Sequence, residues 1–100
     1  MPAAVRNQAS TQRAVVRALA AAASDEYAAA VAEGRVVETI EYQDARGFLL
    51  EAQRLLNGTA TRQPRALQTV QAMLRAFPSA QPPQRTVLSP EQLRRLQAQL

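Results

Sequence analysis

The segment ASTQRAVVRALAAAASDEYAAAVA, residues 9–32, indicates the fold class of this chain. Its larger apolar residues recur at steps of three and four, which is the spacing of one face of an α-helix. Gly34 follows and predicts the end of this helix, because glycine readily adopts the left-handed conformation that closes a helix. Ser24 and Asp25 could instead cap a second, shorter helix, so a bend at this point is the alternative. The predicted buried face consists of Val15, Leu19, Ala22, Ala23, Tyr27, Ala30 and Val31.

A second helix is predicted from Glu38 to Leu56. Glu38 and Glu41 lie in its first turn, where the helix dipole favours negative charge, and Asn57-Gly58 marks its end. The apolar residues of this segment again keep helical spacing and form one stripe. The stripe consists of Ala45, Phe48, Leu49, Ala52, Leu55 and Leu56.

Two shorter helices are predicted in the second half of the chain. One begins at Pro64, which a first helical turn tolerates, and ends before Pro78. Residues 78–87 contain three prolines and predict an extended linker. The last helix opens with Ser89-Pro90-Glu91-Gln92, in which serine is the N-cap, proline takes the first helical position and glutamine can return a bond to the cap. The residues that then face the core are Leu93, Leu96 and Leu100.

Four amphipathic helices predict an all-α fold, namely an up-and-down antiparallel four-helix bundle, because each apolar stripe needs a neighbouring helix to cover it. One hundred residues suffice for a single domain, residues 1–100, in which we expect residues 1–8 to be flexible. The abundance of alanine predicts a thin core in which helices approach closely. Strand-type alternation of Val, Ile and Thr is absent, which favours helices alone.

The composition excludes most kinds of catalytic chemistry. The chain contains no His, no Cys and no Lys, which removes imidazole and thiolate chemistry, disulfides and most zinc sites. Gly34, Gly47 and Gly58 are isolated, whereas a phosphate-binding loop needs clustered glycines. We therefore predict no enzyme, no cofactor and no metal-ligand set. No apolar run reaches the length that spans a bilayer.

All twelve basic residues are arginines, and with eight acids they give a formal charge of +4. The arginines are spread along the chain, and only Arg94 and Arg95 are adjacent. No basic stripe is implied, so nucleic acid is not a predicted partner.

The candidate binding residues are glutamates and tyrosines of the first two helices. Glu38, Glu41 and Asp44 follow one another at steps of three and could offer oxygen ligands to a cation, with a tyrosine as a further ligand for ferric iron. The favoured interpretation is that these acids gather at a helix start for electrostatic reasons alone. Tyr27 and Tyr42 each follow a glutamate, and we favour rings at the edge of the core whose hydroxyls reach water or a polar neighbour.

One stretch resembles a known family. Residues 26–36, EYAAAVAEGRV, followed by Glu41-Tyr42 and Phe48, are similar to the soluble extracytoplasmic helical region of bacterial high-affinity iron permeases of the Ftr type. That region commonly has an acidic residue and Tyr, then Ala-Val, an acidic residue and Gly, a Val, and soon Glu-Tyr ahead of a Phe. The chain departs from the family at Ala28-Ala29, where Pro-Gly is common, and it lacks the Arg-Glu-x-x-Glu motifs that carry iron in the membrane.

The resemblance implies a periplasmic, all-helical domain linked to iron uptake, either beside a permease or as a free-standing relative. It also implies that the binding residues gather where the first two helices meet, with a permease or another protein as partner. The alternative is a helical module unrelated to iron, which binds either a helix of another protein or a second copy of itself.

Met1-Pro2-Ala3-Ala4 lacks the regions of a signal peptide, so we expect any export signal to lie outside this sequence. The binding residues are Glu26, Tyr27, Glu38, Glu41 and Tyr42.

Overall fold

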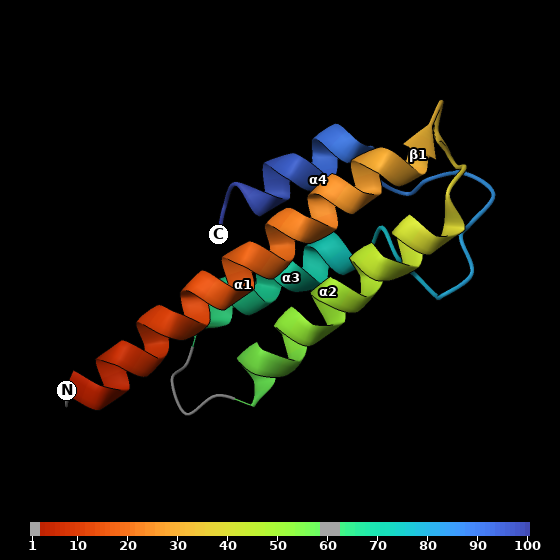
Figure 1. The fold of residues 1–100 in the computed structure, drawn as a ribbon. Coiled ribbons are helices and arrows are strands. Elements are labelled where there is room, and N and C mark those ends of the chain that lie inside the picture. The colour runs from red at the N-terminus through yellow and green to blue at the C-terminus, as the bar shows by residue number, and fades with distance from the viewer. Residues whose placement is uncertain (1–2, 59–62) are drawn as a thin grey trace.

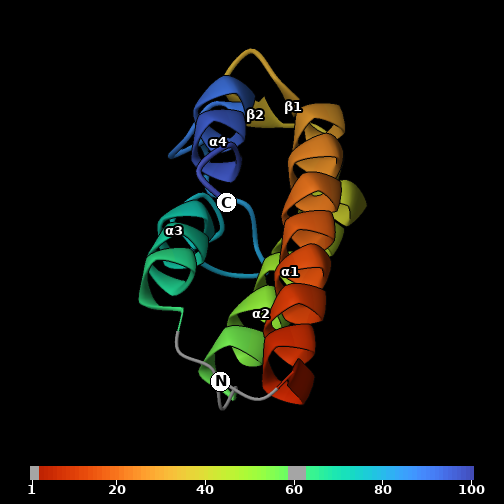
Figure 2. The same cartoon turned by 90° about the vertical axis from the view of Figure 1, so that its left-hand side faces the viewer.

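Two long helices joined by a tight hairpin lie side by side, and two shorter helices cover one face of the pair (Figure 1). The computed structural model describes residues 3–58 and 63–100, with side chains described from Ser10 onward. Figure 2 shows the short helices following one another along a molecule that measures 49 × 21 × 17 Å. The elements are α1 (Ala3–Ala30), β1 (Val31–Ala32), β2 (Arg35–Val36), α2 (Thr39–Asn57), α3 (Pro64–Leu74) and α4 (Pro90–Gln97).

The hairpin between α1 and α2 is a small antiparallel sheet that the sequence did not predict. Val31 pairs with Val36 and Ala32 with Arg35. Glu33 and Gly34 form the turn with φ values of 55° and 75°, and two positive φ values in succession are typical of the type I′ turn of a two-residue hairpin. α1 therefore ends at Ala30, earlier than Gly34 suggested, because the chain reverses through this turn instead of closing the helix with a glycine cap.

α1 is continuous through Ser24, so the alternative of a bend and a second cap at this position is wrong. Ser24 is only 2% exposed, in the middle of the buried face of the helix. The predicted face is buried at Ala23, Tyr27 and Ala30, but near its start Val16 is buried whereas Val15 is 42% exposed. Val16 packs with Ala52, Leu56 and Val70, which come from α2 and α3 and therefore determine the side of α1 that is covered.

The core lies along the helix pair α1 and α2 and is rich in alanine. The predicted stripe of α2 is buried at Ala45, Leu49, Ala52 and Leu56, and Tyr42 joins it. Fully buried alanines on both helices allow the two backbones to approach closely. The larger of two core clusters lies toward the hairpin and contains Ala20, Ala23, Tyr27, Ala30, Tyr42, Ala45, Leu49, Met73, Ala76, Phe77 and Leu93.

The two short helices begin where their sequence signals predict. Pro64 is the first residue of α3, which ends at Leu74, and Phe77 is buried just beyond its end. α4 has the predicted capping box: Ser89 Oγ accepts a hydrogen bond from the backbone N–H of Gln92, and Gln92 Oε1 accepts one from the N–H of Ser89. Four helices are thus present among the described residues, as predicted, together with the unpredicted sheet. No helix in these residues is long and apolar enough to cross a membrane.

Replacing Ser89 by Ala should lower the free energy of unfolding by about 1 kcal/mol, because the N–H of Gln92 loses its acceptor. The measurement is urea denaturation followed by circular dichroism. Ser10→Ala, at an exposed position of α1, is the matched control and should change stability by less than about 0.5 kcal/mol. Equal losses in the two variants would contradict a capping role for Ser89.

Candidate functional site

Three aromatic rings meet at the hairpin end of the helix pair. Tyr27 of α1 and Tyr42 of α2 both contact Phe77, which follows α3. The ring centroids of Tyr27 and Phe77 are 5.0 Å apart with an interplanar angle of 64°, and those of Tyr42 and Phe77 are 5.1 Å apart at 42°. These geometries lie in the favourable range for aromatic pairs. The structure therefore brings the two predicted tyrosines together, with Phe77 as their common neighbour.

Both tyrosine hydroxyls donate hydrogen bonds to the backbone of the segment between α3 and α4. Tyr27 Oη donates to the carbonyl oxygen of Leu88 at 2.5 Å, and Tyr42 Oη donates to that of Ser79 at 2.9 Å. Gln43 Nε2 adds a bond of 3.1 Å to the carbonyl oxygen of Ala80. The tyrosines thus hold this segment near both of its ends, which is a structural role.

Burial raises the pKa of both tyrosine hydroxyls above its ordinary value. Burial of Tyr27 raises its pKa to about 12, and nearby Tyr42 acts in the same direction, while a hydrogen bond with Thr86 opposes it. Burial also raises the pKa of Tyr42, against the opposing effects of Arg46 and of the bond to Ser79. A tyrosine ligand for ferric iron would have to lose its proton and leave its carbonyl partner. These hydroxyls are consequently poorly placed to bind a metal ion.

The three predicted glutamates are at least partly exposed. Glu26 on α1 and Glu41 in the first turn of α2 are partly exposed, and Glu38 is exposed immediately before α2. Glu38 makes no side-chain cap bond to the helix. Within the described part of the chain, no group of three or more His, Cys, Asp or Glu side chains could hold a metal ion. The glutamates are therefore surface carboxylates, whereas the tyrosines next to two of them in the sequence are buried.

Sequence reasoning missed Phe77 and the backbone carbonyls of Ser79 and Leu88 as parts of this arrangement. Phe77 falls at the end of the third predicted helix, just before Pro78, where its spacing marks it only as an apolar helix residue. The one available signal was the small number of aromatic residues. With only two Phe and two Tyr in the chain, each ring is a candidate for the core. Carbonyl oxygens belong to every residue, so no sequence pattern marks the two that accept these bonds.

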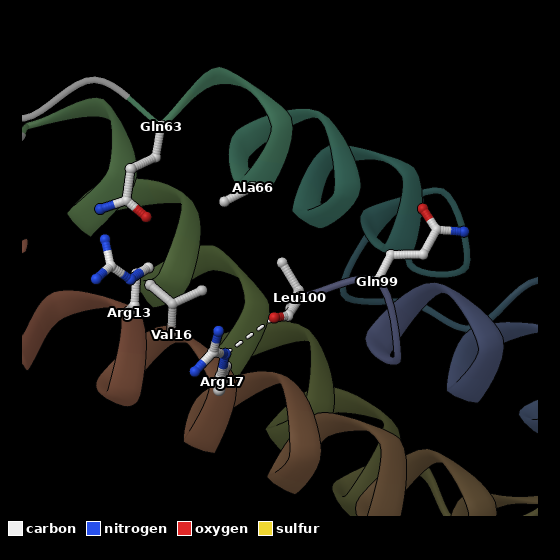
Figure 3. Close-up of a pocket in the computed structure, with 7 residues that line it drawn as sticks. All are labelled: Arg13, Val16, Arg17, Gln63, Ala66, Gln99 and Leu100. Carbon is white, nitrogen blue, oxygen red and sulfur yellow. Dashed lines mark hydrogen bonds between the residues drawn. The ribbon is translucent and has the colours of Figure 1, made fainter. Parts of the chain in front are cut away.

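A separate pocket of about 90 Å³ lies away from the hairpin, between α1, α3 and the segment after α4 (Figure 3). None of the predicted binding residues lines it. Arg17 Nε donates a hydrogen bond of 2.9 Å to the backbone oxygen of Leu100 at its edge. The pocket is lined by Arg13, Val16, Arg17, Gln63, Ala66, Gln99 and Leu100.

The free energy of unfolding should fall as the pH rises from about 10 to about 12. The unfolded chain releases the Tyr27 proton near pH 10, whereas the folded chain holds it to about pH 12, so alkaline pH favours the unfolded state. Urea denaturation across this interval, with a parallel phenolate absorbance titration, measures the effect. Tyr27→Phe should remove most of the slope, and an unchanged slope in that variant would refute the assignment.

Comparison with family models matches residues 2–100 to the iron permease-associated 4-helix bundle domain. The resemblance seen in residues 26–48 is therefore confirmed, and the match extends over nearly the whole chain. No curated protein and no solved structure shows a significant match. By its sequence and its four helices, the chain belongs to the family of iron permease-associated 4-helix bundle domains.

Proposed function

We propose that this chain is a non-enzymatic accessory domain of a bacterial iron-uptake system, which acts in the periplasm by binding a membrane permease. The observation that carries the proposal is the family match over residues 2–100. The up-and-down antiparallel order of the four helices is also part of the proposal.

The chemistry of the chain supports binding rather than catalysis. The sequence has no His, Cys or Lys, which most often serve as general base or activated nucleophile. The two tyrosine hydroxyls are already engaged as donors to backbone carbonyls. Side chains that remain for contact with a partner include carboxylates, guanidinium groups, glutamine amides and exposed aliphatic groups.

We assign the contact to the hairpin-end surface, which we define as Glu26, Val37, Glu38, Ile40 and Glu41. Val37 and Ile40 are 58% and 69% exposed, and aliphatic groups rimmed by charged ones are typical of protein contact surfaces. Tyr27 and Tyr42 are fully buried directly beside Glu26 and Glu41 in the sequence. Under this proposal the tyrosines position the helices and the glutamates touch the partner.

A photo-cross-linking residue in place of Ile40 should form a covalent adduct with the permease in cells that produce both proteins. The same residue in place of the exposed Arg95, on α4, is the matched control and should give no adduct. Ile40→Asp should lower both complex formation and uptake of radioactive iron, because the aliphatic contact is lost. Adducts from position 95 alone, or normal uptake without the domain, would refute the proposal.

A second candidate is a self-associating module unrelated to iron, and the exposed aliphatic side chains of Val37 and Ile40 favour it as well. Light scattering over a dilution series separates the two functions. If the chain is an accessory domain, it should have the mass of a monomer at all concentrations, and the Ile40→Ser variant should have the same mass. A dimer that dissociates on dilution, and is weakened by Ile40→Ser but not by Val15→Ser, would instead support self-association.

A further inference from the structure

The pocket between α1, α3 and the segment after α4 has two guanidinium groups at its edge and an apolar floor (Figure 3). Arg13 and Arg17 are four residues apart on α1, so their side chains emerge from the same side of that helix. Val16, Ala66 and Leu100 supply the apolar surface. The volume of about 90 Å³ has room for several water molecules or one small anion, and it is far below that of a typical cofactor site.

The two guanidinium groups are available to a ligand. Arg17 directs its Nε to the backbone oxygen of Leu100, which leaves its two terminal nitrogens for other acceptors. Both arginines are exposed, and no Asp or Glu side chain in the described residues forms an ion pair with either of them. The one acid near this end of the helix pair, Glu51, is paired with Arg54.

The distribution of charge along the chain makes this part of the molecule basic. Seven of the eight acids lie in residues 25–51, whereas residues 1–24 contain three arginines and no acid. The hydrogen bond from Gln12 Nε2 to the carbonyl oxygen of Leu55 places the first half of α1 beside the end of α2, away from the hairpin. Arg13 and Arg17 are therefore remote from most of the carboxylates, so the local potential favours an anion.

We propose that this pocket binds a small oxyanion through Arg13 and Arg17, either free phosphate or the phosphate of an anionic lipid headgroup. A guanidinium group presents parallel N–H donors that match the oxygens of a phosphate, and it stays charged at every physiological pH. Ala66 and Val16 border the space that the anion fills. This site is independent of the partner surface proposed above.

The test is a titration of the isotope-labelled full chain with inorganic phosphate, followed by NMR of backbone and arginine side-chain signals. Saturable shifts are expected around residues 13–17 and Ala66. Arg13→Gln and Arg17→Gln should each raise the Kd about tenfold, because each removes a charge-assisted hydrogen bond. Ala66→Leu should also abolish binding, since it fills the pocket without changing the charge.

Arg35→Gln is the matched control, because it removes the same charge from the hairpin. Circular dichroism checks that every variant keeps its helices. A parallel arm measures co-sedimentation with phosphatidylcholine vesicles that contain or lack phosphatidylglycerol. The chain could bind the anionic vesicles but show no saturable binding of inorganic phosphate. If the same pocket variants then lost vesicle binding, the lipid headgroup would be identified as the ligand. No saturable binding in either arm, or equal weakening by Arg35→Gln, would overturn the proposal.

Discussion

The contact of Phe77 with Tyr27 and Tyr42 is the interaction on which the rest of the structure depends. It joins α1, α2 and the end of α3 at one point, and the two hydroxyl bonds extend it to Ser79 and Leu88. Each aromatic pair contributes about 0.5–1.5 kcal/mol beyond the area it buries. Without these contacts the segment between α3 and α4 would lose its bonds to α1 and α2, and α4 would be held by Leu93 in the core and by the ion pair of Arg94 with Asp25.

The alanine-rich core explains why both proposed sites lie on the surface. Ala20, Ala23, Ala45 and Ala52 are fully buried, so α1 and α2 lie too close together to enclose a large internal cavity. Two separate regions of the surface differ in their charge. The hairpin end offers carboxylates and aliphatic groups, whereas the opposite end offers arginines around a small pocket.

Much of the fold could be predicted because its signals are local. The four helices follow from apolar spacing, and the start of α4 follows from Ser89, Pro90 and Gln92, which act within one helical turn. The meeting of Tyr27 with Tyr42 was also expected, but only because the family resemblance implied it. The hairpin was not predicted, because a positive φ at Glu33 is uncommon for a residue with a side chain and has no sequence signature.

The sequence by itself determined that the chain is helical, where α4 is capped, which side-chain types it lacks and which family it belongs to. Only the tertiary structure decided that Val16 rather than Val15 faces the core, and that the tyrosine hydroxyls bind Ser79 and Leu88. The physical reason is separation along the chain. Helix periodicity and capping involve neighbours a few residues apart, whereas these hydrogen bonds join residues 37 and 61 positions apart and form only when all four helices have packed.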